Sequence, residues 1–187
     1  MGPACHSNRA MDSALCVFAG DVCLRVDPEM LQLCKGLEAS ERAAPNAQWT
    51  WLCKDTAFFT LFKLQRDTLL FSHGNGVLYH ASPMAHLAPA CPSGTAFLCQ
   101  FTYDSLPEGR APKLLAFDTL SPLPAEQRGE RLRALAVHLP QPACSVQWVG
   151  PRQYLSAEFV GGLPHPAAGL FSLSDDPLLR GPTEEFV

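Results

Sequence analysis

The sequence lacks several features that would assign it to a common class of protein. Its lysine and arginine residues are isolated rather than clustered, its net charge is −4 and its isoelectric point is near 5.8. Proteins that grip duplex nucleic acid through many phosphates carry a basic face, so a broad duplex-binding surface is excluded. No apolar stretch of about 18 residues occurs, which predicts no membrane span.

Paired cysteines and zinc-ligand patterns are also missing. The eight cysteines include no Cys-x-x-Cys pair, and no histidine pair is joined to cysteines at a zinc-ligand spacing. The first residues show no basic segment followed by an apolar run, so no signal peptide is expected. These observations predict reduced, buried thiols, no metal site, no cofactor, and a location in the cytoplasm, the nucleus or both.

The chain contains enough apolar residues to form the core of one folded domain. The chain has 187 residues, 47% of them hydrophobic. The pattern of residue types along the chain changes near residue 47. We predict an N-terminal extension over residues 1–47, with a short helix that begins at Pro28, and a β-rich domain over residues 48–187.

Strand signals begin at Gln48 and recur along the chain. Aromatic and β-branched residues over Phe58–Phe62 predict a buried strand, and Ser72–Gly76 predicts the turn of a hairpin between Thr68–Phe71 and Val77–His80. We expect one meander from Trp49 to Tyr79. Further strands are predicted beside it and beyond it, at Ala96–Tyr103, Lys113–Phe117, Ser145–Val149 and Gly169–Leu173.

One helix is predicted after these strands, over Ala125–Leu139. Leu132, Leu135 and Leu139 recur at spacings of three and four, and charged residues occupy the rest of its surface. The predicted fold class is therefore α+β, with a mainly antiparallel sheet and one surface helix packed on it.

The order and spacing of the β-rich segments resemble a known family. They are similar to the nucleotidyltransferase domains of messenger RNA capping enzymes and nucleic-acid ligases, and even more to the cap-binding domain of snurportin. The segments that carry the resemblance are Gln48–Leu64, Thr68–His80, Ala96–Asp104, Lys113–Leu120 and Pro166–Leu173. The resemblance implies that type of sheet, and we expect a ligand pocket between the Trp49 and Gly169 strands.

The catalytic motifs of that family are largely missing. Its nucleophilic lysine corresponds to Lys54, but the glycine that completes the motif is absent. The segment Leu98–Phe101 has no carboxylate where the family has acids that contact ribose and metal, and Ala168–Phe171 lacks the acid and lysine of the next motif. The family's final motif is not found. Because phosphoryl transfer depends on those charges, these losses favour a pseudoenzyme.

Tryptophans are the candidate binding residues. Trp49, preceded by Gln48, corresponds to a cap-contacting tryptophan of snurportin, and a methylated guanine stacks well on such a ring. Trp51 shares the strand face of Trp49, and Trp148 lies in a segment similar to one in snurportin. All three are alternatively core aromatics, an interpretation that we favour for Trp51 and Trp148.

Three hypotheses follow from the sequence. The first is a non-catalytic module that binds an RNA 5′ cap or a guanine nucleotide and also contacts protein partners. The second is an active guanylyltransferase or ligase that uses Lys54. The third is a structural or assembly subunit with a degenerate pocket.

Overall fold

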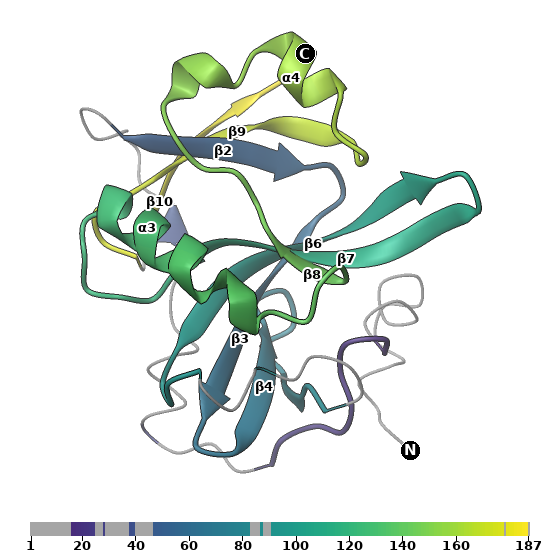
Figure 1. The fold of residues 1–187 in the computed structure, drawn as a ribbon, viewed down its shortest axis with the longest axis vertical. Coiled ribbons are helices and arrows are strands. Elements are labelled where there is room, and N and C mark those ends of the chain that lie inside the picture. Colours follow the sequence, from purple (N-terminus) through teal and green to yellow (C-terminus); the bar gives the residue numbers. More distant parts are fainter. Residues whose placement is uncertain are drawn as a thin grey trace.

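The computed structural model describes residues 16–24, 28, 38–39, 47–82, 87, 91–177 and 179–186. Within them the strands form two sheets (Figure 1). The six-stranded sheet has the order β5-β4-β3-β6-β7-β8, and the four-stranded sheet has the order β1-β10-β9-β2. Of the helix predicted to begin at Pro28, only Pro28 itself is described, and the rest lies outside the described residues. No helix in the described ranges is both long and apolar enough to cross a membrane.

The six-stranded sheet contains the predicted hairpin and the strands beside it. Its strands are β3 (Ala57–Leu64), β4 (Asp67–Ser72), β5 (Leu78–His80), β6 (Ala96–Leu106), β7 (Gly109–Thr119) and β8 (Cys144–Val146). The hairpin prediction is confirmed, with Leu70 opposite Tyr79. In its turn, Gly76 takes a φ of 70°, and the Asn75 side chain accepts a hydrogen bond from the Val77 amide at 2.9 Å.

The four-stranded sheet corrects one part of the sequence prediction. It consists of β1 (Glu38–Ala39), β2 (Gln48–Cys53), β9 (Ala167–Leu173) and β10 (Leu179–Glu185). Because β2 pairs with β9, the predicted single meander from Trp49 to Tyr79 is wrong. The prediction of a ligand pocket between the Trp49 and Gly169 strands is wrong for the same reason, because these two strands are directly hydrogen bonded to each other.

The turn after β2 explains this error. Asp55 adopts a left-handed backbone with a φ of 53°, and the chain passes there from one sheet to the other. Alternating apolar residues identify a strand and its buried face, but they do not identify its pairing partner. The α+β class and the mainly antiparallel pairing are confirmed, although the strands form two sheets instead of one.

The predicted helix is confirmed as α3 (Ala125–Leu135), continued by the 3-10 turn η2 (Ala136–His138). Leu132, Leu135 and Leu139 are buried in the main core, which lies under the six-stranded sheet. Two smaller elements follow later in the chain, the 3-10 turn η3 (Arg152–Tyr154) and the short helix α4 (Ala157–Gly161). Figure 1 shows α4 above the four-stranded sheet.

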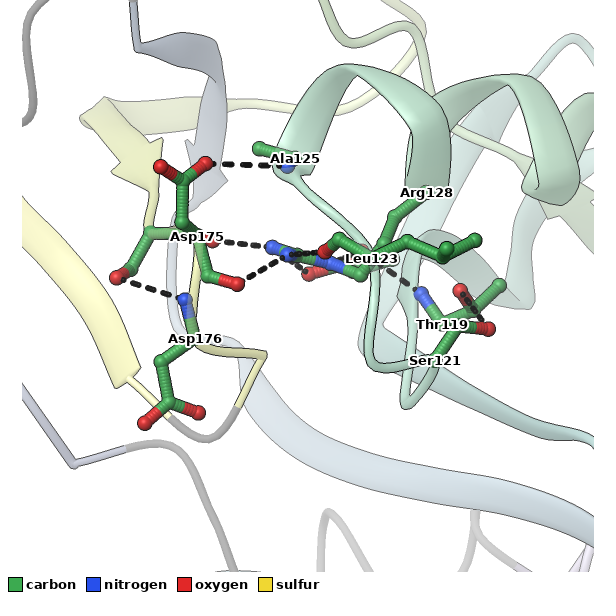
Figure 2. Close-up of polar contacts among 9 residues, drawn as sticks. Thr119, Ser121, Leu123, Ala125, Arg128, Asp175 and Asp176 are labelled. Carbon is green, nitrogen blue, oxygen red and sulfur yellow. Dashed lines mark hydrogen bonds and ion pairs between the residues drawn. The ribbon is translucent and has the colours of Figure 1, made fainter.

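A buried arginine attaches α3 to the ends of two strands (Figure 2). Arg128 is fully buried, and its guanidinium forms two bonds with the Asp118 carboxylate, at 2.9 and 3.2 Å. It also donates to the carbonyl groups of Leu123, Asp175 and Ser174. Burial raises the pKa of the Asp118 carboxyl, and the Arg128 charge opposes that shift.

Five described cysteines are buried thiols outside any disulfide, as predicted: Cys23, Cys53, Cys91, Cys99 and Cys144. The prediction is wrong for Cys16, which is disulfide-bonded. Disulfides depend on the proximity of two Cα atoms in the fold, and the spacing of cysteines along this sequence gave no indication of that proximity.

Gly169 provides a test of the four-stranded sheet. A Cβ atom built at Gly169 lies 2.4 Å from the Glu184 carbonyl oxygen, so Gly169→Ala is expected to push β10 from β9. We expect a loss of about 1 to 3 kcal/mol in the free energy of unfolding, measured in denaturant. The matched control is Gly161→Ala, because a Cβ there meets nothing within 4 Å. Equal stability of the two variants would contradict the β9–β10 pairing.

Candidate nucleotide-binding groove

A groove of about 390 Å³ lies where β2 begins, between α3 and η3. Its lining includes the two predicted residues Gln48 and Trp49, together with Glu126, Arg152 and Gln153. Trp49 forms both backbone hydrogen bonds of an isolated bridge with Gly150, at 2.7 and 3.0 Å. This bridge fixes the segment that leads into η3 alongside β2, and thereby sets one wall of the groove.

Trp49 contributes only a small part of its surface to the groove, since 9% of the residue is exposed. The Arg152 guanidinium lies 5.7 Å from the centroid of its ring, within the range of a cation–π contact. Arg152 also donates from Nε to Glu184 at 2.9 Å. The groove therefore combines an aromatic ring with a half-exposed cation at its edge.

Glu126 supplies a negative charge on the opposite side. It stands in the first turn of α3 and is exposed. None of the ion pairs formed among the described residues includes its carboxylate. In the sequence, Glu126 belongs to the charged face of the predicted helix, and Arg152 lies in none of the predicted elements or motifs. Neither showed a pattern that linked it to Trp49, because the three residues meet only through the fold.

Trp51 lies outside this groove. It is 4% exposed, and its indole Nε1 donates to His165 Nε2 at 3.0 Å. His165 Nδ1 lies 2.9 Å from Asp104, and Lys113 Nζ lies 2.6 Å from the other oxygen of that carboxylate. Burial tends to raise the pKa of Asp104, but Lys113 and His165 outweigh it and hold that pKa below its usual value. Trp51 is thus a core residue, and its indole N–H ends a buried row of hydrogen bonds that passes through His165 and Asp104.

A second buried network connects β2 to the six-stranded sheet. The Gln100 side chain accepts from the Cys53 amide at 2.9 Å and donates to the Trp51 carbonyl at 3.0 Å and to Gln147 at 2.9 Å. Gln147 donates in turn to Thr50 Oγ1 at 2.6 Å and to the Trp51 carbonyl at 2.8 Å. These side chains occupy the space between the two sheets and are fully satisfied there.

The positions expected to carry acids in an active enzyme are buried and apolar. Cys99 and Phe101 stand where the third family motif has its carboxylates, and both are fully buried in the main core. Lys54 lies in the turn after β2, where its amide donates to the Pro166 carbonyl at 2.9 Å and its side chain is exposed. Lys54 does not line the groove at Trp49.

Trp148 is also placed away from the groove, and it is not a core residue. It is 37% exposed, and its ring lies near Tyr154 and Phe159, with centroids 6.3 and 6.0 Å away. Its carbonyl oxygen accepts a hydrogen bond from Thr50 at 2.7 Å. Of the four predicted binding residues, Gln48 and Trp49 therefore line the groove, whereas Trp51 and Trp148 do not.

No protein-family model and no curated protein matches the chain. Solved structures that match the chain include the ligase domain of M. tuberculosis LigD, with a TM-score of 0.47 and 13% identity over 86% of this chain and 57% of that one. Another is mycobacterial DNA ligase D in complex with ATP and MES, with a TM-score of 0.44 and 12% identity over 78% and 60%.

The chain spans less than two thirds of the length of either ligase structure. This likeness assigns neither a family nor a reaction to the chain. The closer resemblance to the cap-binding domain of snurportin stays a prediction.

Proposed function

We propose that this protein binds a guanine nucleotide, such as an RNA 5′ cap, in the groove at Trp49 without transferring it. The single observation that carries the proposal is the placement of an aromatic ring, a carboxylate and a guanidinium around one groove: Trp49, Glu126 and Arg152. A methylated guanine is positively charged and stacks on an indole ring. Its edge carries donors that a carboxylate accepts, and its phosphates suit an arginine.

The absence of catalysis is the second part of the proposal. Phosphoryl transfer needs charged groups that stabilise the reacting phosphates. Lys54 is exposed outside the groove, and core residues occupy the positions of two acids. The Asp104 carboxylate is already engaged by Lys113 and His165. These placements favour a binding module over a guanylyltransferase or ligase.

A calorimetric titration of a methylated cap dinucleotide into the protein tests the proposal. Glu126→Gln removes the negative charge from an exposed position, so we expect cap affinity to fall by about tenfold while the melting midpoint stays unchanged. Glu130→Gln, an exposed change on the same helix outside the groove, is the matched control. Trp49→Ala should weaken binding by about 1 to 3 kcal/mol and, because the ring is largely buried, should also lower stability.

Two results would contradict this assignment. Undetectable cap binding by the wild-type protein would favour the structural-subunit hypothesis. Incubation with radiolabelled GTP or ATP is expected to leave no covalent label on the protein, and a labelled band that disappears in Lys54→Ala would support the enzyme hypothesis instead. Because Arg152 is, among the described residues, the only arginine or lysine that lines the groove, we expect the affinity for the cap to fall only gently with salt concentration.

A further inference from the structure

Exposed aromatic side chains gather around a second, larger pocket. This pocket measures about 810 Å³ and lies at α4, the start of β9 and the end of β10. Among the described residues, four large aromatic side chains are exposed: Trp148, Tyr154, Phe159 and Phe186. Phe186 lines the pocket, Phe159 is part of α4, and Trp148 joins Phe159 to Tyr154 through ring contacts. We name these four residues and the pocket the aromatic surface.

The interior of this pocket offers few free polar groups. Both ring nitrogens of His165 are engaged, one with Trp51 and one with Asp104. Ser156 Oγ accepts from the Phe159 amide, and Arg152 is paired with Glu184. The other lining residues are mainly aliphatic, among them Leu155, Val160 and Leu170. The pocket therefore suits an apolar side chain rather than a polar or phosphorylated group.

The charges beside the aromatic surface are mainly negative. Glu158 lies within α4 between two lining residues, and Glu185 is the last residue of β10, directly before Phe186. Both are exposed, and no ion pair among the described residues includes either carboxylate. The nearby cation Arg152 is held by Glu184. A ligand for this surface therefore meets uncompensated negative charge around an apolar centre.

We propose that the aromatic surface docks a segment of a partner protein that inserts apolar side chains into the pocket and carries lysine or arginine beside them. Clusters of exposed aromatic residues are typical of protein interfaces, whereas single exposed apolar residues are common everywhere. Basic residues of the partner complement Glu158 and Glu185, which gives the interface its orientation and selectivity. This surface is distinct from the groove at Trp49, although Arg152 borders both.

Selection from a displayed library of random twelve-residue peptides, with the full chain as bait, tests this proposal. We expect the enriched peptides to combine large apolar residues with lysine or arginine. Their affinity should fall at least tenfold in Phe159→Ser combined with Phe186→Ser, two changes at exposed positions. Val137→Ser, at a residue that is 79% exposed on η2, is the matched control and should bind like the wild type.

A reversal of charge at the two glutamates provides the second part of this binding experiment. Glu158→Lys combined with Glu185→Lys should weaken the same basic peptides about tenfold while leaving the melting midpoint unchanged. The proposal is overturned if no peptide is enriched, if enriched peptides show no excess of basic residues, or if both double variants bind them normally. A concentration-dependent dimer in sedimentation that the Phe159→Ser and Phe186→Ser changes abolish would assign the surface to a second copy of this chain, and would also overturn it.

Discussion

Arg128→Met is expected to destabilise the protein by about 3 to 5 kcal/mol. The guanidinium is fully buried and forms both bonds with Asp118, so its removal leaves an uncompensated carboxylate in the interior. Figure 2 shows that Arg128 also donates to the carbonyl groups of Leu123 and Asp175, and the substitution removes this donor from both. Chemical denaturation at pH 7, with Arg131→Met at an exposed position of the same helix as control, measures the loss.

The pH dependence of that variant has a definite sign. Burial already raises the pKa of Asp118, and removal of the Arg128 charge raises it further. A raised folded-state pKa means that the folded protein takes up a proton before the unfolded chain does as the pH falls. The stability deficit of Arg128→Met should therefore shrink between pH 7 and pH 5. A deficit below about 1 kcal/mol at pH 7 would show that Arg128 does not hold the helix to the strands.

The local pattern of residues in the sequence was sufficient to predict much of this fold. The turn at Ser72–Gly76 and the apolar face of the helix at Ala125 each contain their own signal, and both elements formed as predicted. The pairing of β2 with β9 joins residues more than a hundred positions apart, and nothing in the alternation of Trp49 and Trp51 specifies that partner.

For the same reason, only some of the residues that line the candidate groove could be predicted from the sequence. Gln48 and Trp49 follow one another in the sequence, and the family resemblance identified them directly. Glu126 and Arg152 reach the groove from a helix and a 3-10 turn whose positions depend on the buried contacts of Arg128 and on the Trp49–Gly150 bridge. A charged residue on an exposed face has no local signature that distinguishes binding from solubility.

Gln100→Leu is expected to destabilise the protein by about 2 to 4 kcal/mol, the second large effect. Leucine is similar in size, but it leaves the Cys53 amide without its acceptor and the Gln147 side-chain oxygen without its donor. Each buried polar group left unpaired costs about 1 to 3 kcal/mol. The Trp51 carbonyl stays paired, because Gln147 still donates to it at 2.8 Å. Gln127→Leu, at an exposed position on α3, is the control and should change stability by less than about 0.5 kcal/mol.

A double-mutant cycle separates this network from ordinary packing. Gln100→Leu and Gln147→Leu each leave the other glutamine side chain with an unpaired group, whereas the double variant removes both partners of their shared bond. The double variant also removes both donors of the Trp51 carbonyl, which each single variant keeps in part. Its loss should therefore differ from the sum of the single losses by at least about 0.5 kcal/mol: the shared bond makes it smaller, and the unpaired Trp51 carbonyl makes it larger. Strict additivity would mean that the two glutamines act independently. In that case each glutamine would stabilise the space between the two sheets through its own bonds to β2.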